Sequence, residues 1–286
     1  MFTFLPGSKL VIDNNGSGVT INPESISIDQ TFQETNFSLK TIQTPNMVKE
    51  SLVQKRAQAS FSFTYHMDAG AIDSVIWGWA GLVESNTLKF DINPVITARP
   101  IEKDFYLATL NKNVKVSNAV LEDIEVQVGH DKIAKLVISG SAKLVEVLNT
   151  IPFTPSTTEQ NYLGNNFIDV NIGGTGLQSV LTSSLSIRKS ITWLDQPTIH
   201  SRIAGDIYVP TVPIQTEFSV SGRYTILLTD NNLTARDDSI ILTSGAFKLN
   251  LDNCTISDRV GIEKVLTKSL DFKMRPQSSD SYIQYI

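Results

Sequence analysis

Histidine and cysteine are the residues that most often bind metals, and this sequence has few of them. The histidines are His66, His130 and His200, and none lies at metal-ligand spacing from another. Cys254 is the only cysteine, so no disulfide can form within the chain. Because a structural zinc site needs a cluster of nitrogen or sulfur ligands, we expect no metal site and no cofactor.

A glycine-rich segment, Asn171–Gly176, has the look of a phosphate-binding loop. It lacks the third spaced glycine of a dinucleotide fingerprint and the Gly-Lys-Ser/Thr of a P-loop. We therefore interpret it as a β-turn or a flexible loop. The sequence also has no Gly-x-Ser-x-Gly motif, which in hydrolases carries the nucleophilic serine.

Two acidic pairs, Glu122/Asp123 and Asp237/Asp238, are the remaining candidates for catalysis. Paired carboxylates can act as the acid and the nucleophile or base of a glycosidase. Each pair is expected in a turn-like segment, where acids are normally solvated. With no nucleophile next to a base, we do not expect an enzyme.

Tryptophan side chains could stack on a sugar or a base, and Trp77, Trp79 and Trp193 are the candidates. Trp77 and Trp79 fall within a predicted helix, so we expect them to pack in a core or an interface. A carbohydrate-binding β-sandwich that uses one of these indoles stays open as an alternative function.

The composition is that of a folded protein with a mildly acidic surface. The chain has 286 residues, 41% hydrophobic and 19% charged, with a formal net charge of −5. Stable binding to duplex DNA depends on lysine and arginine neutralising phosphates, so a stably bound nucleic acid is not expected. We find no signal peptide pattern and no apolar run long enough to span a membrane.

Alternation of polar and apolar residues dominates the sequence and predicts strands. Similar segments recur in the same order, which indicates two copies of one β-rich unit. Phe218 and Val220 occupy the places of Phe61 and Phe63. The matched pairs are Ser25–Phe32 with Ser184–Ile191, Ala59–Tyr65 with Thr216–Gly222, Asn118–Asp123 with Asn253–Asp258, and Ile133–Val147 with Val265–Met274.

Proline and hydroxyl residues between the copies predict a linker. We place the first unit at residues 1–150, the linker at 151–160 and the second unit at 161–286. The clearest helix is Asp68–Gly81, with Asp68 as its N-cap and Gly81 as its stop. The equivalent segment, Asp230–Asp238, is polar and is expected to be a single turn or no helix. The predicted fold is therefore mainly β with one or two short helices.

A long polar connection precedes the phenylalanine-rich strand in each copy. These connections are Lys40–Gln58 and Asp195–Gln215. Long connections without regular structure are uncommon in compact domains and are often functional. Their basic residues are candidates for contacts with a neighbouring subunit: Lys49, Lys55 and Arg56 in the first, and Arg202 in the second.

This order of strands, long insertion, phenylalanine-rich strand, helix and closing strand resembles the tail tube proteins of tailed bacteriophages. The resemblance rests on Ala59–Tyr65, Asp68–Gly81 and Lys132–Val147 and on their second-copy partners. It implies two tandem tube-like domains, each a β-sandwich or half-barrel, whose inner sheets join a multi-subunit β-barrel. Proteins with two such domains form rings of three chains, and these rings stack into the tail tube, the conduit for genome ejection.

Small and charged side chains would line the lumen of such a tube. In the first copy these are Ser60, Ser62, Thr64, Ser139, Ser141 and Lys143. In the second copy they are Glu217, Ser219, Ser221, Thr267, Ser269, Asp271 and Lys273. The residues Lys49, Lys55, Arg56 and Arg202 would lie in loops that stack one ring on the next.

The resemblance also implies partners and a location. The chain would assemble with copies of itself and with other tail proteins, such as the tape measure, baseplate and terminator proteins. DNA would pass through without specific binding, and no membrane is involved. The location would be the virion tail, after assembly in the host cytoplasm. A baseplate, hub or distal tail ring component is the nearest alternative.

Overall fold

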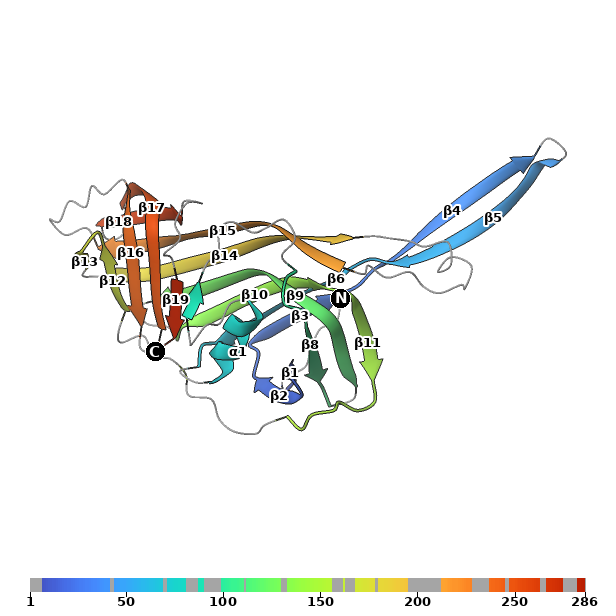
Figure 1. The fold of residues 1–286 in the computed structure, drawn as a ribbon, viewed down its shortest axis with the longest axis horizontal. Coiled ribbons are helices and arrows are strands. Elements are labelled where there is room, and N and C mark those ends of the chain that lie inside the picture. Colours follow the sequence, from blue (N-terminus) through green and yellow to red (C-terminus); the bar gives the residue numbers. More distant parts are fainter. Residues whose placement is uncertain are drawn as a thin grey trace.

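The computed structural model describes most of the chain as antiparallel strands with one short helix (Figure 1). The described residues are 7–41, 44–68, 71–80, 87–89, 99–110, 112–129, 133–155, 162, 168–177, 180–194, 212–227, 237–244, 247–262, 266–274 and 282–285. The expected mainly-β fold is confirmed.

The elements run along the chain as follows. The first set is β1 (Lys9–Asn14), β2 (Ser17–Ile21), β3 (Ser25–Asp29), β4 (Phe32–Thr41), β5 (Thr44–Arg56), β6 (Ala59–His66), α1 (Ala71–Trp79), β7 (Thr87–Lys89), β8 (Lys103–Ala108), β9 (Asn113–Gly129), β10 (Lys135–Ala142) and β11 (Leu144–Leu148). The second is β12 (Ile168–Ile172), β13 (Thr175–Leu177), β14 (Val180–Leu194), β15 (Val212–Leu227), β16 (Asp237–Ser244), β17 (Phe247–Ile262), β18 (Leu266–Met274) and β19 (Tyr282–Tyr285).

One continuous antiparallel sheet runs through both halves of the chain, and we call it the inner sheet. Its order is β3-β6-β10-β9-β14-β15-β18-β17. The first half supplies β3-β6-β10-β9, and the second half repeats this order as β14-β15-β18-β17. The two halves meet where β9 pairs with β14.

A second layer packs over part of the inner sheet in each half. In the first half its order is β2-β1-β8-β9-β11. In the second half it is β13-β12-β16-β17-β19, and β7 adds to β19. The long strands β9 and β17 therefore belong to both layers. Each carries an asparagine in the left-handed region at its crossing, Asn118 (φ 51°) and Asn253 (φ 52°), a conformation that asparagine tolerates better than most residues.

The first hairpin of each half is closed by a two-residue turn. Asn15 and Gly16 have φ of 55° and 87°, and Gly173 and Gly174 have φ of 57° and 82°. Positive φ at both central residues is the mark of a type I′ turn, which suits the twist of hairpin strands. The segment Asn171–Gly176 is thus the β12–β13 hairpin, as the sequence predicted, and not a phosphate loop.

Burial alternates along β6, which explains why it forms an inner strand with two unlike faces. Phe61 and Phe63 are buried, while Ser60 is exposed and Ser62 is half-buried. The Phe61 ring stacks on Trp79 of α1 at 5.9 Å between centroids. Helix α1 thus packs against the apolar face of the inner sheet.

Helix α1 is shorter than predicted and begins differently. It starts at Ala71, so Asp68 does not occupy the position directly before the helix. Asp73 in the first turn accepts hydrogen bonds at Oδ1 from the Tyr65 hydroxyl (2.8 Å) and from the Asp68 backbone N–H (3.3 Å). Gly81 and most of Asp230–Asp238 lie outside the described residues.

Lys189 of β14 links the second half to the end of α1. Its Nζ donates a hydrogen bond to the carbonyl oxygen of Ala80, directly after the helix. Helix C-termini carry partial negative charge and favour a cation there. Burial nevertheless lowers the pKa of Lys189 to about 8.

The lowered pKa of Lys189 predicts that the free energy of unfolding rises between about pH 8 and pH 10. In this window the unfolded chain keeps the lysine proton and the folded chain loses it, so raising the pH favours folding. The slope should approach about 1.4 kcal/mol per pH unit. Urea unfolding across this range should show the slope in the natural chain and a flatter profile in Lys189→Met. Equal slopes would contradict the lowered pKa.

Each half places a glycine opposite a phenylalanine in the middle of the inner sheet. In the first half Phe61 of β6 pairs with Gly140 of β10. In the second half Gly222 of β15 pairs with Phe272 of β18. A Cβ on Gly140 would lie 2.7 Å from the Phe61 ring, and one on Gly222 would lie 2.3 Å from the Phe272 ring. The ring covers the glycine in both halves, but the two residue types have exchanged strands.

The first long connection forms a β-hairpin, which corrects the expectation of an unstructured insertion. Strands β4 and β5 pair from Phe32↔Arg56 to Thr41↔Thr44, and the hairpin projects away from the body (Figure 1). The sequence of β5 has no alternation of polar and apolar residues that would have revealed this strand. Of the second connection, residues 195–211 lie outside the described part, and β14 and β15 pair up to Leu194↔Val212.

Candidate lumen surface and sheet edges

The pairing register gathers the expected lumen residues on one face of the inner sheet, which we call the polar face. Residues directly opposite each other in antiparallel strands share a face. One such row across the sheet is Ser27, Ser62, Ser139, Asp123, Arg188 and Ser219. A neighbouring row is Ser25, Thr64, Val137, Glu125, Ser186, Ser221, Lys273 and Thr255.

The remaining expected residues fall on the same face except Lys143, and Ser141 lies on this face but is buried. Ser60, Glu217, Thr267, Ser269 and Asp271 all follow the alternation of their strands. Lys143 lies in the bend between β10 and β11, outside both strands. Ser141 is a correction, because it is only 3% exposed in the chain and is covered by Trp193.

The cover over Ser141 is a small polar cluster. The Trp193 Nε1–H donates to Ser141 Oγ at 2.7 Å, and Ser141 Oγ bonds Oε1 of Glu122. Glu122 is the extra residue where β9 shifts register against β10. Partial burial raises the pKa of Glu122, while the hydrogen bond from Ser141 lowers it. The indole of Trp193 therefore covers this end of the polar face.

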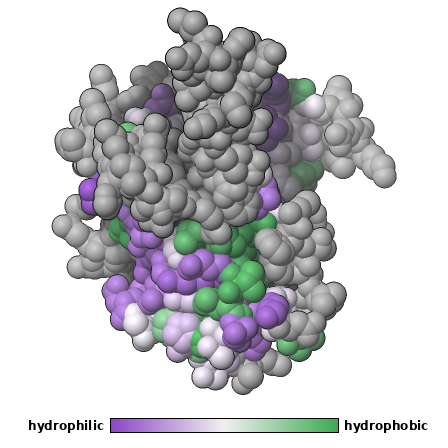
Figure 2. Space-filling view, turned by 90° about the vertical axis from the view of Figure 1, so that its right-hand side faces the viewer, coloured by the Kyte–Doolittle hydropathy of each residue, from purple (hydrophilic) through white to green (hydrophobic). Residues whose placement is uncertain are grey.

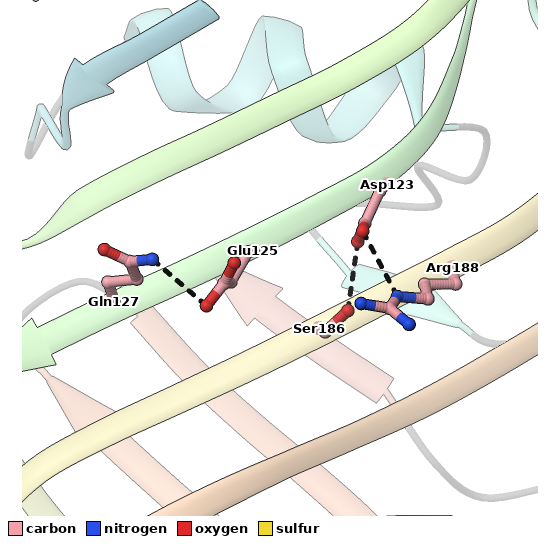
Figure 3. Close-up of polar contacts among 5 residues, drawn as sticks. All are labelled: Asp123, Glu125, Gln127, Ser186 and Arg188. Carbon is pink, nitrogen blue, oxygen red and sulfur yellow. Dashed lines mark hydrogen bonds and ion pairs between the residues drawn. The ribbon is translucent and has the colours of Figure 1, made fainter. Parts of the chain in front are cut away.

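Several polar-face residues were missed by the sequence reasoning. Asp123, Glu125 and Gln127 alternate along β9, and Ser186 and Arg188 lie beside them on β14 (Figure 3). Asp123 accepts from Ser186 Oγ at 3.0 Å and from Arg188 Nε at 3.2 Å. The expectation of a turn at Glu122/Asp123 was wrong, although the alternation from Asp123 to Gln127 could have revealed the strand.

The other acidic pair and His66 lie in strands. Asp237 and Asp238 begin β16 and do not lie in a turn. His66 ends β6, and its ring meets the Tyr162 ring edge-on at 5.4 Å. His130 and His200 lie outside the described residues. Within the described part of the chain, no group of three or more His, Cys, Asp or Glu could hold a metal ion.

The family of the chain follows from its match to one family model. Residues 1–286 match the model described as the Bacteriophage Baseplate Tube Protein Family. The chain belongs to this family. It is therefore a structural component of the phage tail or baseplate, located in the virion, where it assembles with other tail or baseplate proteins. A search of the curated proteins found no match.

The tryptophans that were candidates for carbohydrate binding are all buried. Trp77, Trp79 and Trp193 are 3%, 1% and 8% exposed, so none presents a free ring face to a sugar. The Trp79 Nε1–H is also occupied, since it donates to the Ala119 carbonyl at 3.0 Å. Among the described residues, no helix has the length and apolar character needed to cross a membrane.

The inner sheet ends with β3 on one side and with β17 on the other. Strand β3 pairs only with β6, and beyond Thr255 strand β17 pairs only with β18 within the described residues. Residues 257–261 of β17 are all exposed, and Val260 is 60% exposed. Unpaired strand edges readily pair with another chain. Among the residues that the structure describes, the sheet therefore has one open edge at each end.

Proposed function

We propose that three copies of the chain close into a ring whose inner sheets form one β-barrel around a water-filled lumen. The supporting observation is an inner sheet with one polar face and an open strand at each end. Pairing between copies would remove these edges, which are an aggregation hazard in a single chain. On this proposal the repeated strand order reflects a duplication, with units at 1–150 and 161–286 joined by 151–160, and it gives the ring pseudo-sixfold symmetry.

Strand number sets the size of the barrel. Three copies of the eight-stranded inner sheet would supply about 24 strands, and barrels of roughly 16 strands already enclose an aqueous channel. A barrel of this size cannot be filled by its own side chains. It would leave an open bore, which a conduit for DNA requires.

The charge on the polar face suits passage of DNA better than binding. The acids Asp29, Asp123, Glu125, Glu217 and Asp271 are balanced by the bases Lys135, Arg188, Arg223, Arg259 and Lys273. With the two signs equal in number and small hydroxyls between them, the surface has no excess of lysine and arginine to hold phosphates. We propose that the ring conducts the genome during ejection without catalytic turnover.

The projecting β4–β5 hairpin is the element best placed to reach an adjacent ring (Figure 1). Lys49, Lys55 and Arg56 lie on β5, opposite Leu39, Gln33 and Phe32. Arg202, the fourth expected stacking residue, lies outside the described part. Hydrophobic side chains are mixed with hydrophilic ones on the end of the molecule from which the hairpin projects (Figure 2). We propose that this end contacts the next ring in the tube.

The family description favours a ring at the baseplate, whereas the hairpin also suits repeated stacking into the longer tail tube. Mass photometry and negative-stain microscopy of the full chain test the ring itself, and trimeric hollow rings are the expected result. A chain that stays monomeric at high concentration with the other tail proteins present would overturn the proposal. The copy number per virion then separates the two roles, since a baseplate ring has few copies and a tail tube many.

A further inference from the structure

The junction between the two halves is an internal example of the contact that would close the ring. There the last inner strand of the first half, β9, pairs with the first inner strand of the second half, β14. If the repeat continues around the ring, the last strand of the second half, β17, meets β3 of the next copy. The register of β9 with β14 then predicts the register of β17 with β3.

Equivalent rows of paired residues fix how the two halves correspond. In the first half one row is Ile28, Phe61, Gly140 and Leu121. In the second half the row with the same phenylalanine–glycine pair is Leu185, Gly222, Phe272 and Ile256. Ile28 therefore corresponds to Leu185, and Leu121 corresponds to Ile256.

The left-handed asparagines agree with this correspondence. Asn118 precedes Leu121 by three positions, and Asn253 precedes Ile256 by the same three. Strand β9 then contains one extra residue, Glu122, at its register shift, whereas β17 continues in register with β18. Asp123 consequently corresponds to Ser257, since their partners in the next strand, Ser139 and Asp271, lie on the polar face.

Applying the correspondence to the junction gives a specific contact. Glu125 pairs with Ser186 and Val126 pairs with Leu185 at the junction. The corresponding residues of β17 are Arg259 and Val260, and those of β3 are Asp29 and Ile28. Resting on the proposed ring, we propose that β17 of one copy pairs antiparallel with β3 of the next, with Arg259 opposite Asp29 and Val260 opposite Ile28.

The chemistry of the two edges supports this register. It places a positive side chain directly opposite a negative one on the polar face. At the internal junction an ion pair of this kind, Asp123–Arg188, lies in the adjacent polar row, with the signs exchanged between the strands. On the other face it covers Val260, an exposed branched side chain, with the edge that carries Ile28. Like charges or a charge against an apolar residue would have argued against it.

A register-specific disulfide tests the contact in the full chain. Cα atoms of directly opposed residues lie about 4.5 to 5.5 Å apart, within the range of a disulfide, whereas diagonal neighbours lie about 7 to 8 Å apart. The variant Asp29→Cys with Arg259→Cys should crosslink copies into dimers and closed trimers under oxidation. The matched control, Ser27→Cys with Arg259→Cys, is displaced by two residues on the same face and should crosslink far less.

The two introduced cysteines of one chain cannot form a disulfide with each other, because β3 and β17 are separated by seven strand spacings, on the order of 30 Å. The natural Cys254 is fully buried and provides a low background. Charge reversal gives a second measurement: Asp29→Arg and Arg259→Asp should each weaken assembly, and the double exchange should restore it.

The outcomes separate the register from the ring. If rings form and the control pair crosslinks as well as or better than the test pair, or neither pair crosslinks, the register is wrong and the ring stands. If the natural chain forms no rings, the proposed function fails and this contact fails with it. Selective crosslinking of the Asp29/Arg259 variant, together with rescue by charge exchange, supports both.

Discussion

Replacing Gly140 with alanine should destabilise the chain by about 3 kcal/mol or more, a large share of the stability of a typical domain. A Cβ at this position would lie 2.0 Å from the carbonyl oxygen of Val120 and 2.7 Å from the Phe61 ring. The ring could rotate, but the carbonyl belongs to the backbone of β9 in the middle of the inner sheet. Relief of the clash therefore requires a shift of paired strands.

Chemical denaturation of matched variants measures this effect. Gly222→Ala should behave like Gly140→Ala, since its Cβ would lie 2.3 Å from the Ser184 carbonyl oxygen. Gly176→Ala is the control, because a Cβ there would have no atom within 4 Å, and it should change stability by less than about 0.5 kcal/mol. Similar denaturation midpoints for Gly140→Ala and Gly176→Ala would show that the paired strands can move apart at this row without loss of stability.

The polar face could be predicted from the sequence because the alternation of polar and apolar residues along a strand does not depend on an exact alignment of the two copies. Matching phenylalanine to phenylalanine set Phe218 in the place of Phe61, but the paired rows put Gly222 there, four positions further on. The error arose because the phenylalanine–glycine pair exchanged strands between the halves. A shift by an even number of residues keeps every side chain on its face, so the residues expected in the lumen were still assigned to the polar face of the sheet.

Features that depend on long-range contacts could not be predicted in this way. Ser141 follows the alternation of its strand, and only the fold reveals that Trp193 covers it. The hydrogen bond from Lys189 to the end of α1 likewise joins residues from the two halves of the chain. The β4–β5 hairpin escaped detection for a different reason. Strand β5 lacks the alternation of polar and apolar residues that marks a half-buried strand.

Replacing Val260 with aspartate should strongly weaken ring formation while leaving the single chain about as stable as before. Val260 is 60% exposed on the open edge of β17, so the substitution should change the free energy of unfolding by less than about 0.5 kcal/mol. In the proposed ring it faces Ile28 of the next copy, and a carboxylate buried there would cost several kcal/mol, because Lys268, opposite it in β18, already pairs with Asp258. Because about 1.4 kcal/mol corresponds to tenfold in affinity, assembly should need at least about a hundredfold higher concentration.

Val147→Asp provides the matched control for this edge. Val147 is 58% exposed, almost the same as Val260, but it lies on β11, outside the inner sheet. It should change neither the stability of the chain nor the formation of single rings, as judged by denaturation and by mass photometry over a concentration series. If both variants assembled like the natural chain, the open edge of β17 would have no part in closing the ring. If Val147→Asp alone blocked assembly, the contact between copies would have to be sought on the second layer.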